Sequence, residues 1–454
     1  MIENCRSCGS SDLSVVLDLG EHPVPNALLQ PDEAGFPEKT YPLKLAFCRA
    51  CALLQVMETV PADELYRRDY PYFSSSSAAL LQHARAHAQS ICRSRRLGAD
   101  SLVVEIASND GYLLKNFVAA GIPVLGVDPA AAPAAKANAI GVPTLNEFFS
   151  AALAGELARG GRRADVIIAN NVVAHVDAIN DFVAGFKRLL KDDGVALFEF
   201  AYAVDMVKKC EYDTIYHEHL FYHTISSITP LFERHGLYVN DALRLPIHGG
   251  SLRLQVGHRR EPTPRLLQLA REEQSMGVGD LSFYRDFAAR VERHAAATRS
   301  LLRELKRSGR SIACYGAAAK GCTMVNYLGL GEGFFDFVAD ANPFKQGKLM
   351  PGERIPIVHP DALGERHPDD VFLLVWNFAG EVLRAQAGYR RAGGRFIVPL
   401  PELRIVEPGD EVHSDFAYDG GDAERIAIGR RQRPAEPVDR GGPAAAESVL
   451  GGSS

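Results

Sequence analysis

The stretch Ser101-Leu-Val-Val-Glu-Ile-Ala-Ser-Asn-Asp-Gly111 decides the fold class of this chain. Its apolar run 101–106 predicts a buried strand, the small polar residues after it predict a tight turn, and the periodicity of 111–120 predicts a helix. A second buried strand is predicted at 123–127 and ends at Asp128. Short apolar runs that alternate with helices are typical of βαβ units, so we expect a parallel sheet.

The same alternation continues along the chain. More strands are predicted at 164–169 and 194–200, and those of a second α/β unit at 311–315, 335–339, 371–376 and 395–398, with a helix at 321–330. A helical stretch, 264–307, joins the two units. We expect a small lobe at 1–75, α/β domains at 76–245 and 246–410, and a disordered Gly/Pro-rich tail at 411–454.

The composition is that of a globular protein. Of 454 residues, 46% are hydrophobic and 23% charged, which excludes a disordered, collagen-like or disulfide-framework chain. The net charge of −6 provides no general attraction for nucleic acid. The sequence has neither a signal-peptide pattern nor an apolar run of about 20 residues, so we expect a cytoplasmic protein without membrane contact.

Four of the eight cysteines form two CxxC pairs, Cys5 with Cys8 and Cys48 with Cys51. Four thiolates suit a tetrahedral Zn²⁺ site, and the residues between the pairs would then fold as a small lobe. Because no further ligand or catalytic group accompanies the cysteines, we expect a structural metal. The alternative is two unrelated pairs of buried thiols.

The turn after the first strand predicts a cofactor site. In a parallel sheet the cofactor's polar part lies at the helix N-terminus, and Asp128 would bind ribose hydroxyls. The turn lacks GxGxxG, and its acidic residues disfavour a pyrophosphate but suit the cationic S-adenosylmethionine. The candidate cofactor-binding residues are Glu105, Ala107, Ser108, Asn109, Asp110, Gly111, Asp128, Glu147, Phe148 and Asn171. An ordinary helix cap with an Asp-Gly turn is the alternative.

A dense titratable run, Tyr216-His217-Glu218-His219, follows the fourth strand, and His175 is expected on the neighbouring loop. The spacing is not HExxH, which argues against a zinc protease. A histidine with a pKa near neutrality can remove a proton from a carbon next to a carbonyl. Glu218 would either orient that ring or bind a substrate hydroxyl.

A second glycine turn, Tyr315-Gly-Ala-Ala-Ala-Lys-Gly-Cys-Thr323, follows the strand at 311–315. It is not a P-loop, because Cys322 occupies the position of the Walker lysine. Lys320 beside a helix N-terminus suits a diphosphate, and Lys345 and Lys348 add positive charge. The alternative is a turn that only closes the fold, with a solvated loop nearby.

Together these motifs resemble the bacterial sugar C-methyltransferases that act on nucleotide-diphosphate 4-keto-deoxysugars. The resemblance covers almost all of residues 1–405. It rests on the paired cysteines and on segments 70–75, 105–114, 171–182, 212–220, 248–253, 316–321, 340–352 and 374–377. Ala107 replaces a glycine common in methyltransferases, and the tail lies outside the resemblance.

The resemblance implies an α/β protein with a small N-terminal zinc lobe, a central class I methyltransferase (Rossmann-like) sheet and a second, C-terminal Rossmann-like domain. It implies S-adenosylmethionine bound at 105–148, a dTDP-sugar held between the lobes, and a role in deoxysugar and antibiotic biosynthesis.

The resemblance also implies site residues. His219 would be the general base, and Glu218, Tyr216, His175, Tyr70 and Tyr72 would support it. Lys320 is a candidate for the diphosphate because of its own position beside a helix N-terminus, and not because of the resemblance. The remaining substrate-binding candidates are His217, Tyr315, Lys345 and Arg253. We expect a monomer or a weak homo-oligomer.

Other functions are less consistent with the sequence. A nicotinamide-dependent sugar reductase or epimerase would need a GxGxxG turn and a Tyr/Lys pair, and neither is found. A zinc scaffold without enzymatic activity would not need the His/Glu run. A methyltransferase that modifies oxygen or carbon of a non-sugar small molecule remains the alternative.

Overall fold

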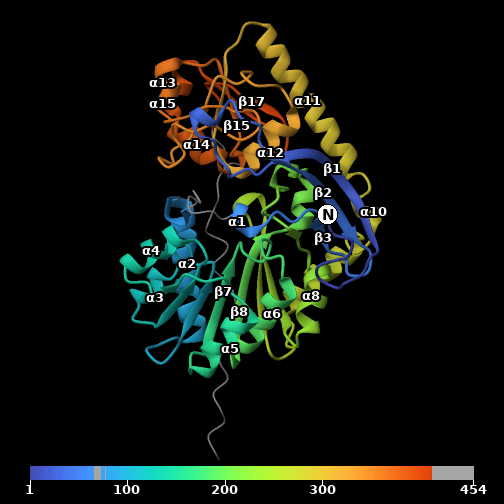
Figure 1. Cartoon of the computed structure of the whole chain (residues 1–454), viewed down its shortest axis with the longest axis vertical. Helices are drawn as coiled ribbons and strands as arrows, with labels where there is room; N and C mark the ends of the chain where they lie inside the picture. The colour runs from blue at the N-terminus through green and yellow to red at the C-terminus, as the bar shows by residue number, and fades with distance from the viewer. Residues whose placement is uncertain (66–72, 77, 412–454) are drawn as a thin grey trace, which may run out of the picture.

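The central sheet is the largest of three sheets in the computed structural model, which describes residues 1–65, 73–76 and 78–411. Figure 1 shows this sheet in the lower half of the molecule, the C-terminal sheet in the upper half, and β1, β2 and β3 at the right between them. The proposed tail from residue 412 onward and the candidates Tyr70 and Tyr72 lie outside the described residues.

The central sheet has the strand order β10-β11-β8-β7-β4-β5-β6, and β11 alone is antiparallel to both of its neighbours. The strands are β4 (Val103–Ile106), β5 (Val124–Val127), β6 (Thr144–Leu145), β7 (Ala164–Asn170), β8 (Leu190–Ala201), β10 (Tyr238–Leu245) and β11 (Ser251–Gly257). The helices and the 3-10 turn are α2 (Ala78–Arg95), α3 (Lys115–Val118), α4 (Ala131–Ala139), α5 (Ala151–Arg159), α6 (Ile179–Leu189), α7 (Ala203–Lys208), η3 (Tyr212–Thr214) and α8 (Ile225–Arg234). The chain reverses its direction across the sheet between β4 and β7, where ligands bind in such folds.

The C-terminal sheet has the order β14-β13-β12-β15-β16-β17, parallel except for β17. Its strands are β12 (Ile312–Tyr315), β13 (Val338–Ala339), β14 (Ile357–Val358), β15 (Asp370–Leu373), β16 (Arg395–Val398) and β17 (Arg404–Val406). The helices and 3-10 turns of this region are α10 (Leu281–Tyr284), α11 (Phe287–Arg307), α12 (Ala319–Leu328), α13 (Ala362–Arg366), η5 (Trp376–Phe378), α14 (Ala379–Ala385) and α15 (Ala387–Arg391). The 3-10 turn η4 (Ile247–Gly249) instead connects β10 to β11, and α9 (Pro264–Ser275) packs against β10 of the central sheet. This is the strand order of a dinucleotide-binding fold, with its crevice between β12 and β15.

The N-terminal sheet is antiparallel, in the order β1-β2-β3-β9. Its strands are β1 (Leu13–Pro23), β2 (Thr40–Cys48), β3 (Leu54–Val56) and β9 (Phe221–Tyr222), and the short helices nearby are η1 (Pro31–Glu33), α1 (Ala62–Leu65) and η2 (Ser74–Ser76). The edge strand β9 follows the Tyr216–His219 run directly. A strand from the middle of the chain therefore completes the sheet of the cysteine lobe.

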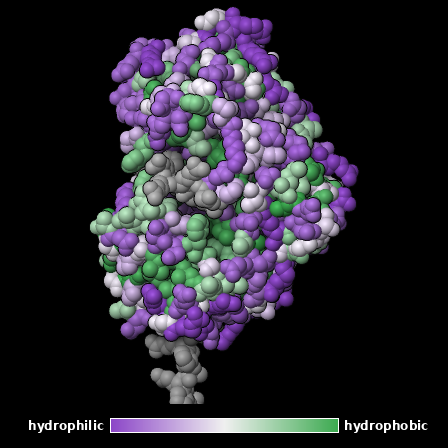
Figure 2. All heavy atoms as spheres, viewed as in Figure 1, coloured by the Kyte–Doolittle hydropathy of each residue, from purple (hydrophilic) through white to green (hydrophobic). Residues whose placement is uncertain are grey.

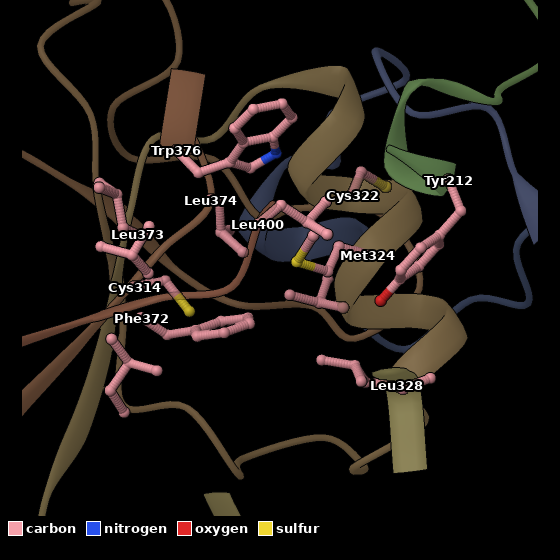
Figure 3. Close-up of a cluster of buried hydrophobic side chains, with 14 of the residues drawn as sticks. Tyr212, Cys314, Cys322, Met324, Leu328, Phe372, Leu373, Leu374, Trp376 and Leu400 are labelled. Carbon is pink, nitrogen blue, oxygen red and sulfur yellow. The ribbon is translucent and has the colours of Figure 1, made fainter. Parts of the chain in front are cut away.

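The N-terminal sheet contributes to two hydrophobic cores. One core joins Phe47 of β2 to the C-terminal domain, and the other joins Cys48 to the central domain. Figure 3 shows part of the first core, where Tyr212 of η3 lies alongside Met324 and the rest of α12. A lobe of this size buries little surface by itself, so both larger domains stabilise it.

The predicted fold class is confirmed, with local differences. The helix predicted at 111–120 is shortened to α3, because Gly111 has a φ of +76°, which no α-helix accommodates. The strand predicted at 371–376 ends at Leu373 and continues into η5. Most of the face in Figure 2 is hydrophilic, and no helix of the described segments combines the length and apolar character needed to cross a bilayer.

Gly316, in the turn between β12 and α12, is expected to tolerate no side chain. Its φ is +91°, and an added Cβ would lie 2.4 Å from Cγ1 of Val375. Gly316→Ala should cost about 1–2 kcal/mol for the left-handed backbone and about 1–3 kcal/mol more for overpacking. The measurement is urea unfolding followed by circular dichroism. Gly331→Ala is the matched control, since Gly331 has a φ of +97° and no atom within 4 Å; equal losses in both variants would contradict the tight contact with Val375.

Candidate active site

A cavity of about 670 Å³ opens where the three parts of the chain meet. Its lining includes Asn26 and Thr59 from the N-terminal lobe, Asn109 and Asp128 from the central domain, and Lys320 and Lys345 from the C-terminal domain. The cofactor turn predicted after β4 and the second glycine turn after β12 therefore open into one space.

At the central-domain end, Asp128 holds the turn after β4 in place. It is the first residue after β5, and its Oδ2 and Oδ1 accept hydrogen bonds from the backbone N–H groups of Asn109 (2.7 Å) and Ala130 (2.8 Å). Asn109 has a φ of +49°, so this bond stabilises an unfavourable backbone conformation. Burial raises the pKa of Asp128. The carboxylate keeps lone pairs for further donors, such as ribose hydroxyls.

The predicted cofactor-binding residues separate into two groups. Those that line the cavity are Ala107, Asn109, Asp128, Phe148 and Asn171. Those outside the lining are Glu105, Ser108, Asp110, Gly111 and Glu147.

The acidic residues outside the lining have other surroundings. Glu105 is fully buried in β4, and burial raises its pKa well above the usual range. Asp110 accepts a hydrogen bond from Lys136 at 2.8 Å and another from Ser75. Its charge is therefore balanced by α4 and not by a ligand in the cavity.

Hydrogen bonds fix the tautomer of His219, which also lines the cavity. Nδ1 lies 3.0 Å from the carbonyl oxygen of Thr214, which can only accept, so Nδ1 carries the proton. Nε2 lies 2.7 Å from the hydroxyl of Tyr216 and accepts from it. Among the described residues, Thr214 and Tyr216 orient this ring. Orientation of His219 was one of the two roles considered for Glu218.

A second imidazole lies against the first. The ring of His175 packs edge-on against His219, with centroids 4.8 Å apart at 78°. Burial lowers the pKa of His175 to about 4. His175 is therefore neutral at physiological pH and adds no positive charge beside His219.

Backbone hydrogen bonds hold this segment in place from two sides. The N–H of Leu220 donates to the carbonyl of Ala174 at 2.7 Å, and its carbonyl accepts from the N–H of Val56 at 2.9 Å. The positions of His219, of the loop carrying His175 and of the cysteine lobe are therefore linked through one residue.

The C-terminal end of the cavity carries two lysines. Nζ of Lys320 lies 4.7 Å from the ring centre of Trp376, in a cation–π geometry. The indole N–H of Trp376 donates to Oδ2 of Asp213 in η3 at 2.7 Å. Lys345 donates to the carbonyl of Ala317 at 2.7 Å, and burial lowers its pKa.

The turns after β4 and β12 share one local design. Asp340 follows β13 as Asp128 follows β5, and its two oxygens accept from the N–H groups of Ala317 and Asn342, each at 2.8 Å. In both α/β domains, the turn after the first strand thus donates a hydrogen bond to an aspartate that follows the next strand.

The other predicted site residues lie outside the cavity lining. His217 is buried, with Nε2 3.3 Å from the carbonyl of Pro42. Arg253 forms a buried ion pair with Glu199 at 2.6 Å. Tyr315 lies at the end of β12 and is half-buried.

Several lining residues were missed by sequence reasoning, namely Asn26, Thr59, Tyr112, Asn377 and Phe378. Asn377 lies in a segment that carries the family resemblance, so a signal existed for it. Asn26 follows a proline-rich run and has no motif of its own.

The four cysteines of the lobe come together as predicted. Their Sγ atoms all lie within 4.8 Å of one another, with Cys5 and Cys51 at 3.7 Å and Cys8 and Cys48 at 3.6 Å. A tetrahedral ion with Zn–S bonds of about 2.3 Å places its sulfurs about 3.8 Å apart. The donor set therefore fits a structural zinc ion.

Comparison with known families matches three successive segments of the chain. Residues 5–66 match a zinc binding domain, 81–242 a methyltransferase domain, and 246–401 a C-methyltransferase C-terminal domain. The chain is 36% identical over 408 residues to the C-methyltransferase NovU of Streptomyces niveus, an alignment that covers 89% of this chain and 97% of NovU.

Two solved structures align with about two fifths of the chain. Magnesium protoporphyrin IX methyltransferase ChlM from Synechocystis PCC 6803, with bound S-adenosylmethionine, is 14% identical and covers 39% of this chain and 78% of its own, with a TM-score of 0.30. An S-adenosylmethionine-dependent methyltransferase from Clostridium acetobutylicum is 12% identical and covers 40% and 92%, with a TM-score of 0.31.

The fold, the cavity and the sequence matches define an S-adenosylmethionine-dependent methyltransferase. Within that class, the chain belongs to the C-methyltransferase family whose members combine an N-terminal zinc binding domain with a C-methyltransferase C-terminal domain.

The zinc site should stabilise the lobe without taking part in catalysis. Cys48→Ser should release the metal and lower the free energy of unfolding by at least about 2.7 kcal/mol, the stabilisation given by a ligand at a hundredfold excess over its Kd. The pH profile of the residual activity should not change. Metal analysis and denaturant unfolding check the first expectation, with Cys92→Ser, outside the cluster, as control. A shifted pH profile would instead indicate a catalytic metal.

Proposed function

We propose that this C-methyltransferase methylates the carbon next to the ketone of a nucleotide-linked 4-keto-deoxysugar, in deoxysugar biosynthesis. His219 is the base that forms an enolate of the sugar. The observation that supports the proposal is the single cavity, because its lining includes the Asp128 turn, the Lys320 turn and His219.

The C-terminal end of the cavity suits a diphosphate. Lys320 and Lys345 both line it, next to the N-terminus of α12. The stacked Trp376 limits the movement of Lys320, and the contact with Ala317 limits that of Lys345. Two restrained cations beside free backbone N–H groups are well suited to an anion of two phosphates.

The acid–base chemistry is assigned to His219 and Tyr216. The hydroxyl of Tyr216 occupies the lone pair of Nε2, so the substrate must displace this hydrogen bond before Nε2 can accept the proton of the C–H bond. The released hydroxyl then becomes a donor for the enolate oxygen. The carbonyl of Thr214 keeps its bond to Nδ1–H and stabilises the imidazolium that forms.

His175 contributes a neutral imidazole. Because burial keeps its pKa at about 4, His175 does not repel the imidazolium of His219. Its position against that ring also limits the movement of the base.

The central-domain end is assigned to the methyl donor. S-adenosylmethionine supplies a methyl group on a sulfonium, which leaves as a neutral thioether when the carbon–carbon bond forms. Asp128 would bind the ribose hydroxyls, and Phe148, which is exposed in the lining, would cover the adenine. The protein's main task is to hold the enolate carbon and the methyl group in contact and to exclude water.

The direct test is incubation with S-adenosylmethionine and a panel of 4-keto dTDP-sugars. We expect a mass gain of one CH₂ group on the sugar. Without the methyl donor, we expect exchange of the α-hydrogen with deuterated solvent. His219→Gln should slow both reactions by roughly 10²–10⁴-fold, as expected for loss of a general base.

His235→Gln is the control for this substitution, because His235 lies outside the cavity and contacts Asn180. Unaltered exchange in His219→Gln would assign the base to another residue. If no sugar in the panel gains mass, the acceptor is a non-sugar small molecule. Methylation without any exchange would point to transfer to oxygen.

Asp128→Asn should weaken the binding of S-adenosylmethionine roughly 10- to 100-fold, since hydrogen bonds to a charged group are worth about 1.5–3 kcal/mol. The measurement is isothermal titration calorimetry. Asp165→Asn is the matched control. Asp165 lies at the start of β7, is also buried, forms an ion pair with Lys191 and does not line the cavity. If both variants bound S-adenosylmethionine with similar affinity, Asp128 would not be a cofactor-binding residue.

A further inference from the structure

Asn26 brings the cysteine lobe into direct contact with a central acid of the site. It lies three residues beyond the end of β1 and lines the cavity. Its Nδ2 donates a hydrogen bond of 2.6 Å to Oε1 of Glu218, which is 192 positions away in the sequence. Glu218 is only 1% exposed, and Asn26 is half-buried, so this hydrogen bond orients an acid that is largely shielded from water.

The backbone around Asn26 is held by hydrogen bonds within its own turn and to the C-terminal domain. The N–H of Ala27 donates to the carbonyl of Val24 in a turn. Leu29 and Leu349 of the C-terminal domain exchange hydrogen bonds of 3.0 and 2.9 Å. The amide of Asn26 thus reaches Glu218 from a segment anchored outside the central domain.

Other groups among the described residues also interact with Glu218. Lys345 of the C-terminal domain interacts with it electrostatically, and so does the thiol of Cys322 in α12. The ring of His175 faces its backbone. Glu218 is therefore approached by a neutral donor from the lobe and a cation from the C-terminal domain.

The ring of His219 is oriented without Glu218. Both ring nitrogens of His219 have partners in Thr214 and Tyr216. Glu218 lines the same cavity, and its Oε1 is fixed from outside the central domain. A buried carboxylate with its orientation fixed selects for a donor on the ligand.

We propose that Asn26 is a positioning residue that, together with the charge of Lys345, holds the carboxyl group of Glu218 toward a hydroxyl or ammonium group next to the reacting carbon of the acceptor. This inference rests on the proposed function, because it places the acceptor at Glu218. It gives the cysteine lobe a part in recognising the acceptor as well as in stabilising the fold.

The test compares Asn26→Ala and Asn26→Asp with Ala27→Ser, an exposed neighbour on the same turn. Asn26→Ala should lower kcat roughly 10- to 100-fold, the cost of a misplaced group in a site, and leave the Kd for S-adenosylmethionine unchanged. Asn26→Asp places a second carboxylate against Glu218. Two such groups share a proton, so the acidic limb of kcat/KM should move up by about one pH unit or more.

The exchanged pair Asn26→Asp/Glu218→Gln provides a rescue that a merely structural role would not give. It again contains one carboxylate and one amide, so the acidic limb should return toward the wild-type position. Zinc content and near-ultraviolet circular dichroism show that each variant is folded. If Asn26→Asp does not fold, the kcat of Asn26→Ala decides.

The inference would be overturned if Asn26→Ala kept the wild-type kcat, or if a folded Asn26→Asp showed no shift in the acidic limb of kcat/KM. Either result would count whatever the exchange experiment on His219→Gln shows. If His219→Gln keeps its exchange while Asn26→Asp still shifts the limb, the assignment of the base fails and the role of Asn26 stands.

Discussion

The peptide groups on either side of Leu220 form the constraint on which the site depends. One donates to Ala174, beside His175, and the other accepts from Val56 in β3. Backbone hydrogen bonds are independent of side-chain identity, and β9 follows at once to complete the N-terminal sheet. The two imidazoles and the cysteine lobe therefore cannot move independently of one another.

This arrangement explains why a small lobe accompanies a methyltransferase sheet. Arg6 lies inside the first CxxC loop and donates to the carbonyl of Val56 at 2.6 Å and to the hydroxyl of Thr59 at 2.6 Å. Thr59 in turn lines the cavity. A metal bound by this loop therefore helps to order the part of the cavity lining around Thr59, through the two hydrogen bonds of Arg6. This role requires no exchange of ligands at the metal.

The sequence predicted the elements that local patterns determine. The strand at 395–398 coincides with β16, and the run before Asn170 forms β7, because apolar residues buried on both faces of a parallel strand leave a continuous signal. β9 has only two residues and leaves no period to detect, whereas β13 lies within the strand predicted at 335–339 but is only two residues long. Pairing of β9 with β3 depends on contacts across more than 160 positions, which no local pattern records.

The site residues that are close together in the sequence could be predicted, whereas those brought together by long-range packing could not. His219, Glu218 and Tyr216 are adjacent in sequence, and their meeting in the cavity follows from the end of β8. Glu105 and Asp110 were grouped with Asp128 because they are acidic residues in or beside the turn after β4. The burial of Glu105 in β4 and the pairing of Asp110 with Lys136 direct both away from the cavity. Asn26 reaches Glu218 only through the packing of the lobe.

The indole beneath Lys320 belongs to the only tryptophan in the 454 residues. The intrinsic fluorescence of the protein at long excitation wavelengths therefore comes from one fluorophore, with an ammonium group over its face and the buried Asp213 carboxylate on its N–H. Both neighbours shift the energy of an excited indole. The emission spectrum of the unlabelled enzyme is thus a natural reporter of events beside Lys320, while the Asp128 turn remains spectroscopically silent.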